Sequence, residues 1–482
     1  MTALHPARTP GLAPRALRPV PFPLVDEIAR HCAQEAEPET VHVEAHLPGH
    51  VDGARLRDAF GRALARHPKA LLRQAPVRWW HRRYTWRPAG APDREPVSFP
   101  EPGPEALRRA RERALTECPS LDAAPPVRLE VIAQGTAGPG TSPDTGPGTA
   151  AGTVLLLTAH HTALDAPSCL RLLATTAELY GGADNSPAHS LAPPPVRGPE
   201  SRVLPSRGDA VTVGRPGPRR PARVAADRGR AAHGSGNGNG NGNGMILTEL
   251  PVPGRPPRAP GAQAPYTVND QLLVAACLAV TRWNRLHEAR PAPVVLTVPV
   301  DDRPRGTEMP LGNGTRLVSV DFGAVPRGAP PSAVSWPPEP ATVARLLRGT
   351  AARTRALKAS RGPQLGLSGA LLTAPVLPVG IRAAVTRGAR AAAAPWTSTA
   401  LLSNIGRLPY PLDFGAAGGR ATGVWFSAPA RMPRGLSFGV LATGGRIQLT
   451  LRWSRALLDD TAAAALCALF EEALAATSWS GT

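Results

Sequence analysis

A chain of 482 residues is long enough for two or three domains of about 100–200 residues each. Hydrophobic residues make up 42% of it, enough for sizeable cores, whereas 48 glycines and 57 prolines predict long irregular stretches as well. The formal net charge of +19 would favour binding to nucleic acid, but no helix-turn-helix, zinc-finger or RNP pattern supports that partner. A phosphate-bearing or acidic partner explains the charge equally well.

Five scattered cysteines without a CxxC pair indicate reduced thiols in a cytoplasm, and they argue against a disulfide framework or a zinc site. Prolines and arginines interrupt the first 23 residues, so no apolar signal core is recognisable. The longest apolar runs are too short, or too interrupted by proline, to cross a bilayer. We therefore expect a soluble, cytoplasmic protein.

The first half of the chain alternates strands and helices after a flexible leader at residues 1–20. Alternating apolar residues predict a strand at 41–47, and an apolar stripe at helical spacing predicts a helix at 51–67. The further predicted elements are a charged helix at 104–116, strands at 127–132 and 153–159, and a helix at 170–180 that ends at Gly181–Gly182.

Residues 186–244 show no periodicity and read as a disordered linker rich in Pro, Arg, Gly and Asn. Nine arginines against three acidic residues lie between positions 196 and 233, and a solvated basic segment is favoured there over a functional patch. The linker divides the chain into an N-terminal lobe at 21–185 and a C-terminal lobe at 245–480.

The second half again mixes strands and helices. Its predicted elements are strands at 246–252, 294–300 and 317–322, helices at 268–286 and 340–360, a hairpin of 436–442 with 446–453, and a closing helix at 460–475. Two halves of similar size and mixed content predict a two-lobed α/β protein.

The strongest chemical signal is the segment TVLLLTAHHTALDAPS at 153–168. An apolar strand leads to His160 and His161 in a turn, and Asp165 follows four residues later. Imidazole titrates near neutrality, so a histidine held at a strand end can take a proton from a nucleophile that attacks a carbonyl. A buried structural histidine pair is the alternative interpretation of the motif alone.

Two other groups of residues suggest chemistry less strongly. Residues 435–439 fit the GxSxG pattern of hydrolases, but that fold places its histidine after the serine and the last histidine here is His287. His42, Glu44 and His46 share one face of a strand and could in principle ligate a metal. A solvated or tunnel-facing side of the strand is the favoured interpretation, and no metal site is expected.

The motif HHTALDA resembles the HHxxxDG signature of the condensation-domain and chloramphenicol-acetyltransferase-like superfamily. Further blocks resemble that superfamily in its own order: VDGARLRDAFGRALARHPKALLR (51–73), PPVRLEVI (125–132), YTVNDQLLVAACLAVTRW (266–283), VVLTVPVDDRP (294–304), LGNGTRLVSVDF (311–322) and LLSNIGRLPYPLDFG (401–415). The chain looks nearest to stand-alone condensation or polyketide-associated acyltransferase proteins. The resemblance implies two chloramphenicol-acetyltransferase-like lobes in a V, with an active-site tunnel between them.

The same resemblance implies roles for single residues. His161 would be the general base, His160 mainly structural, and Asp165 would hold the motif through a salt bridge to Arg303. Asn404 would contact the substrate or an oxyanion, although an Asn that forms the turn before Gly406 is an equal alternative. Ala166 stands where the superfamily commonly has Gly, and it would be strained if that position requires a positive φ.

The resemblance also implies the reaction. The chain would transfer an acyl group from a thioester of coenzyme A or a carrier protein to a hydroxyl or amine acceptor, in natural-product (polyketide or nonribosomal peptide) or lipid biosynthesis. No permanently bound cofactor and no nucleic acid are expected. The alternative is a catalytically silent condensation-like protein that binds a carrier protein or a partner enzyme.

Overall fold

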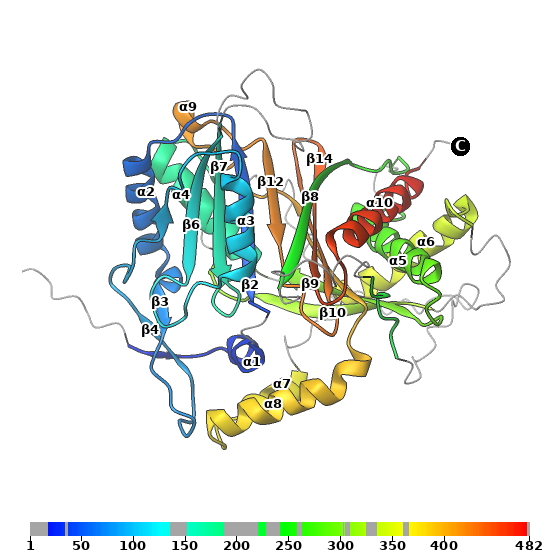
Figure 1. The fold of residues 1–482 in the computed structure, drawn as a ribbon, viewed down its shortest axis with the longest axis horizontal. Coiled ribbons are helices and arrows are strands. Elements are labelled where there is room, and N and C mark those ends of the chain that lie inside the picture. Colours follow the sequence, from blue (N-terminus) through cyan, green and yellow to red (C-terminus); the bar gives the residue numbers. More distant parts are fainter. Residues whose placement is uncertain are drawn as a thin grey trace, which may run out of the picture.

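The computed structural model describes residues 18–33, 37–134, 152–187, 220–227, 242–257, 263–301, 303, 309–323, 335–359 and 366–479 (Figure 1). Within these residues the chain forms two lobes that lie side by side, each a β-sheet covered by helices. This confirms the predicted two-lobed α/β fold.

The N-terminal lobe is built on a five-stranded sheet. Its strands, in order, are β12 (Gly423–Ser427), β2 (Thr40–Leu47), β7 (Gly152–His160), β6 (Val127–Gln134) and β5 (Val97–Ser98). Helices α2 (Gly53–Arg66) and α4 (Ala166–Gly181) pack on one face, and α3 (Ala106–Thr116) packs on the other. Strand β7 is buried on both faces because helices cover the sheet from both sides, which explains its unbroken apolar sequence.

The C-terminal lobe is built on a six-stranded sheet. Its strands, in order, are β10 (Thr315–Phe322), β9 (Val294–Asp301), β11 (Ala400–Arg407), β13 (Leu436–Thr443), β14 (Arg446–Ser454) and β8 (Asn243–Pro251). The helices of this lobe are α5 (Val268–Leu286), α6 (Pro340–Ala359) and α10 (Asp460–Ala476). The bounds of α5 match the sequence prediction, because a capping box between Thr267 and Asp270 fixes its first turn.

One strand is exchanged between the halves of the chain. Strand β12 comes from the C-terminal half but pairs antiparallel with β2 of the N-terminal sheet, where Trp425 lies opposite Glu44. Figure 1 shows β12 between the two lobes. The apolar core of the N-terminal lobe accordingly includes Tyr410, Phe414 and Phe426. This exchange was not predicted, and it ties the lobes together independently of the linker.

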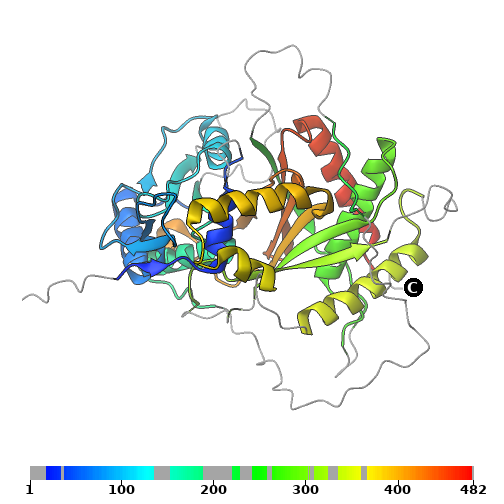
Figure 2. The same ribbon diagram turned by 90° about the horizontal axis from the view of Figure 1, so that it is seen from below.

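The underside of the molecule in Figure 1 is formed by shorter elements from both halves. They are β1 (Val20–Pro21), α1 (Leu24–Cys32), the 3₁₀ turn Pro68–Leu71, β3 (Leu72–Gln74), β4 (Thr85–Pro88), α7 (Gly366–Thr373), α8 (Val379–Ala393) and the 3₁₀ turn Ala394–Trp396. A short helix α9 (Gly415–Gly418) lies at the opposite edge. Figure 2, seen from below, shows α8 running across this underside.

Most of the predicted leader and linker lies outside the described residues. The described parts of the predicted linker are residues 186–187, 220–227 and 242–244. Its last two residues, Asn243 and Gly244, belong to strand β8, so the C-terminal lobe begins earlier than predicted. Residues 220–227 pack on the C-terminal lobe through Ala222 and Val224. The backbone N–H of Ala222 donates to the Pro293 carbonyl at 2.7 Å. This part of the segment is therefore ordered, because its two apolar side chains have a core to enter. No helix among the described residues has the length and apolar character needed to cross a membrane.

Candidate active site

The histidine motif lies in a four-residue turn between a buried strand and a buried helix. Strand β7 ends at His160, and Asp165 is the N-cap of α4, where its Oδ1 accepts from the Ser168 N–H at 3.1 Å. The backbone N–H of His161 donates to the Glu39 carbonyl at 2.8 Å, which ties the turn to the start of β2. Both ends of the turn are thus held by rigid elements.

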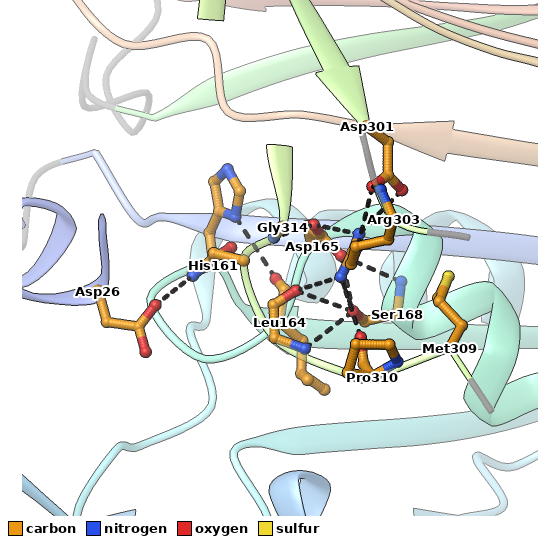
Figure 3. Close-up of polar contacts among 12 residues, drawn as sticks. Asp26, His161, Leu164, Asp165, Ser168, Asp301, Arg303, Met309, Pro310 and Gly314 are labelled. Atoms are coloured by element: carbon orange, nitrogen blue, oxygen red, sulfur yellow. Dashed lines mark hydrogen bonds and ion pairs between the residues drawn. The ribbon is translucent and has the colours of Figure 1, made fainter. Parts of the chain in front are cut away.

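The ring of His161 has one hydrogen-bond partner within the turn. Its Nδ1 lies 3.4 Å from the Leu164 carbonyl oxygen, which can only accept a hydrogen bond (Figure 3). The proton is therefore assigned to Nδ1, which places the basic lone pair on Nε2. Burial lowers the pKa of His161, and the nearby Asp165 carboxylate opposes that shift only in part. The neutral imidazole, the form that accepts a proton, is favoured at neutral pH.

His160 takes part in the turn itself. Its Nδ1 accepts from the Thr162 N–H at 3.1 Å, and burial lowers its pKa to about 3. A histidine that uses a ring nitrogen to hold the backbone suits the structural role predicted for it.

Asp165 binds four donors in the described structure. Its Oδ1 accepts from the N–H and the hydroxyl of Ser168, and its Oδ2 accepts from Arg303 Nη2 at 2.7 Å and from the Gly314 N–H at 3.0 Å. The side chains of Asp165 and Arg303 are only 4% and 11% exposed. The structure thus contains the ion pair that the resemblance implied, and it joins the two lobes.

Arg303 is held between two carboxylates (Figure 3). Its Nε and Nη2 donate to the two oxygens of Asp301 at 2.9 and 3.0 Å, and its Nη1 donates to the Gly312 carbonyl at 2.9 Å. A Cβ placed on Gly314 would overlap the guanidinium, so this position requires glycine. Sequence reasoning did not identify Asp301, Gly312 or Gly314 as site residues, although both glycines lie in the LGNG block.

Asn313, from the same block, connects the histidine turn to α1. Its Nδ2 lies 3.0 Å from the His161 carbonyl, 2.9 Å from the Thr162 carbonyl and 3.0 Å from Asp26 Oδ1. Asp26 Oδ2 also accepts from Trp86 Nε1 at 3.0 Å. Burial raises the pKa of Asp26 to about 6, while the hydrogen bonds from Asn313 and Trp86 counteract part of that shift. Asn313 and Asp26 are therefore positioning residues for the turn.

A buried arginine that sequence reasoning missed supports β2, the strand that pairs with β7 beside the motif. Arg452, on β14, donates to the carbonyl and hydroxyl of Thr40 at 2.8 and 3.0 Å and to Asn243 Oδ1 at 2.6 Å. Thr40 in turn lies opposite His160 in the β2–β7 pairing. Burial lowers the pKa of Arg452 to about 9. This contact runs between the lobes directly beside the histidines.

The side chain of Asn404 hydrogen-bonds to its own strand and to the neighbouring Asn269. Its Oδ1 accepts from the Gly406 N–H at 2.8 Å and its Nδ2 donates to Asn269 Oδ1 at 3.1 Å. The β11–β13 register shifts at this point, and Gly406 has φ of 80°. None of the contacts in the described part of the chain joins Asn404 to His161. The structure thus places Asn404 at a bulge within β11 and not in the expected turn, and a substrate contact stays a prediction.

The backbone strain that a positive φ would impose on Ala166 is absent. Ala166 is the first residue of α4, and among the described residues other than glycine only Glu288 and Leu412 have positive φ. The position therefore demands a helical backbone, which alanine adopts without strain.

On the face of β2 that carries His42, Glu44 and His46, the first two side chains are buried and the third is half-buried. Of the two expected settings, a solvated or a tunnel-facing side, the solvated one was therefore wrong. Helix α3 covers it, and Arg111 binds both oxygens of Glu44 at 2.6 and 2.9 Å. Burial alone would raise the pKa of Glu44, but hydrogen bonds from Arg111 and both histidines hold it well below its usual range. The described residues contain no cluster of three or more His, Cys, Asp or Glu side chains suited to a metal ion.

Ser437, the serine of the GxSxG pattern, is buried in β13 and donates to the Ala428 carbonyl at 2.8 Å. Its hydroxyl is bound within the sheet and is not presented as a nucleophile. The interpretation of this segment as a strand is confirmed.

A cavity of about 410 Å³ adjoins the ion pair on the side of the leader. Residues of both lobes line it, including Asp26, Lys69, Ala163, Arg303 and Leu311. The ring of His161 is not part of its lining, so the predicted tunnel with the histidines at its floor stays a prediction.

No protein-family model matches the chain. An uncharacterised protein of Mycobacterium tuberculosis, found in two strains, is 25% identical over 451 residues, which cover 90% of this chain and 94% of that protein.

Several solved structures share the fold over nearly their whole length. The condensation domain of a monacolin K polyketide synthase has a TM-score of 0.57 at 14% identity and covers 95% of this chain and 97% of its own. Trichothecene 15-O-acetyltransferase from Fusarium sporotrichioides has a TM-score of 0.57 at 12% identity, with coverages of 98% and 99%. A variant of the rhizomide synthetase starter condensation domain in complex with C8-CoA has a TM-score of 0.56 at 15% identity and covers 95% of both chains.

At these identities the likeness defines the fold. The chain has the fold shared by condensation domains and by this acetyltransferase, with two chloramphenicol-acetyltransferase-like lobes, as the sequence predicted.

Proposed function

We propose that this protein is an acyltransferase in which His161 is the general base. The observation that carries the proposal is the hydrogen bond of His161 Nδ1 to the Leu164 carbonyl, which leaves Nε2 to take a proton. The Asp165–Arg303 pair and the Asn313 contacts hold the backbone of the turn around this ring. A base held in one orientation and kept neutral by burial is what proton transfer at neutral pH requires.

The donor is an acyl thioester of coenzyme A or of a carrier protein, and the acceptor is a hydroxyl or an amine. As the acceptor attacks the thioester carbonyl, its proton passes to His161 Nε2 and a new C–O or C–N bond forms. The C–S bond then breaks, and the same proton neutralises the departing thiolate. The products are an ester or amide and the released thiol, so atoms and charge balance without an added cofactor. The binding of C8-CoA to the rhizomide synthetase domain supports a CoA thioester as the donor class.

We place the reaction in natural-product or lipid biosynthesis, because the structural neighbours include a polyketide synthase domain and a trichothecene acetyltransferase. The basic composition suits a phosphate-bearing donor.

The test is thiol release from a panel of acyl-CoA and acyl-carrier thioesters with mixed alcohol and amine acceptors. His161→Ala should lower acceptor-dependent release by about 10²–10⁴-fold. His81→Ala is the matched control, because His81 is an exposed histidine on the underside of the molecule. Release that His161→Ala leaves unchanged would contradict the proposal. No release from any pair, with carrier-protein binding retained, would favour a catalytically silent carrier-binding protein.

A further inference from the structure

An exposed apolar surface lies where the β3–β4 loop meets α7 and α8. We call it the ridge, and it consists of the loop residues 78–83 with the exposed side chains Leu371, Val376, Leu377, Ile381 and Val385. The exposed fraction is 64% for Trp79, 48% for Trp80 and 76% for Val376. Soluble proteins rarely expose so many large apolar side chains on neighbouring segments, so the ridge calls for a partner.

The loop and the helix form one rigid surface. The N–H groups of Gly380 and Val379 donate to the carbonyls of Trp79 and His81 at 2.9 and 2.7 Å, and the Arg382 guanidinium binds the Arg82 carbonyl. A Cβ on Gly380 would come within 2.9 Å of the Trp79 Cβ, so the backbones approach closely there. The tryptophans and the start of α8 are therefore presented together.

The body of the protein holds α8 from its other face. Arg382 is 3% exposed and forms an ion pair with Glu27 of α1 at 2.6 Å. Val379, Ala383 and Thr386 are buried on the same side of α8. Ile381 and Val385, one turn apart on the outer side of α8, are 42% and 49% exposed. A helix stabilised from one side needs no apolar residues on the outer side for folding.

Among the described residues, the exposed charged side chains of the β3–β4 loop and of α8 are all arginines. Arg78, Arg82, Arg83 and Arg387 are exposed, and the Arg78 guanidinium lies 5.2 Å from the centroid of the Trp80 ring. The sequence has no Asp or Glu between Asp58 and Asp93 or between Glu339 and Asp413. Glu27, the nearest acidic residue in α1, is buried and paired with Arg382. An anionic partner would complement these arginines.

The shape of the ridge favours a bilayer over a protein partner. Figure 1 shows the loop and α8 projecting together as the lowest part of the molecule, and Figure 2 shows α8 lying lengthwise across that underside. Tryptophan is suited to the membrane–water interface because its ring is apolar and its N–H is polar. Arginine extends its apolar stem along such a surface while its guanidinium reaches lipid phosphates.

We propose that the ridge binds the surface of an anionic phospholipid bilayer. The tryptophans and the aliphatic side chains of α8 enter the headgroup region, and the arginines contact the lipid phosphates. This proposal is independent of the acyltransferase proposal, since it needs no chemistry at His161.

The test is co-sedimentation of the full-length protein with phosphatidylcholine vesicles, with and without phosphatidylglycerol. We expect binding to the mixed vesicles and much less to phosphatidylcholine alone. The double variant Trp79→Ser/Trp80→Ser should lower the partition coefficient by about tenfold or more. The double variant Arg82→Gln/Arg83→Gln should lower it by about fivefold per arginine, and added salt should reduce the wild-type value.

Matched controls come from exposed residues away from the ridge. Trp479 is 42% exposed near the C-terminus, and Arg62 is exposed on α2, so Trp479→Ser and Arg62→Gln should bind as the wild type does. Far-UV circular dichroism checks that each variant is folded. Absence of binding to the anionic vesicles would overturn the proposal. So would binding that the ridge variants leave unchanged, or self-association through the tryptophans without binding to vesicles.

Discussion

The ion pair between Asp165 and Arg303 offers a quantitative test of what holds the histidine turn. Asp165→Asn keeps the size of the side chain and an N-cap oxygen for Ser168, but it removes the charge and turns a donor toward Arg303 or the Gly314 N–H. Breaking a buried pair from one side costs about 3–5 kcal/mol. Arg303 keeps two hydrogen bonds to Asp301, so we expect a cost near the lower end, about 3 kcal/mol.

The measurement is urea unfolding followed by circular dichroism on the wild type, Asp165→Asn, Arg303→Gln and the double variant. The double-mutant cycle isolates the coupling, which we expect at about 1–3 kcal/mol in favour of the pair. The matched control is Arg62→Gln, whose partner Asp58 is 67% exposed and whose loss should cost at most about 1 kcal/mol. A cost below about 1 kcal/mol for Asp165→Asn, or additive single variants, would refute this account of the site.

Four further outcomes follow from the same geometry. Gly314→Ala should lower the thermal midpoint by several degrees, since its Cβ would displace the Arg303 guanidinium; an unchanged midpoint would contradict the close packing. Ala166→Gly should cost up to about 1 kcal/mol in urea unfolding, because the position is helical; a gain in stability would show strain in the wild type. The acidic limb of kcat/KM should have an apparent pKa below 6.5, because burial lowers the pKa of His161; a limb above that value would count against it as the base. Burial raises the pKa of Asp26 from 3.8 to about 6, so the folded state binds this proton more tightly than the unfolded state does. As pH rises through that range, the free energy of unfolding of the wild type should fall by about 3 kcal/mol relative to that of Asp26→Asn. Unfolding curves whose difference does not depend on pH would disprove the shift.

The local sequence determined most of the elements around the site. The apolar run before His160 predicts the buried strand, and the helix that follows was predicted too, although it begins at Ala166 and not at residue 170. The signals behind these predictions are periodicity and capping, which act over a few neighbouring residues. The resemblance of the histidine motif and the later blocks to a known superfamily predicted the fold, and it implied the pairing of Asp165 with Arg303.

Only the tertiary structure decided which distant residues support the turn. Arg452 contacts Thr40 across 412 positions, and Asn313 binds the carbonyl of His161 across 152. Single polar residues like these have no periodicity, and their partners are backbone groups that every sequence position carries. The exchange of β12 was also hidden from the sequence, because an apolar strand contains no information on which of two sheets it will join. That choice depends on edge pairing and on core packing between the lobes, which exist only once both halves of the chain have folded against each other.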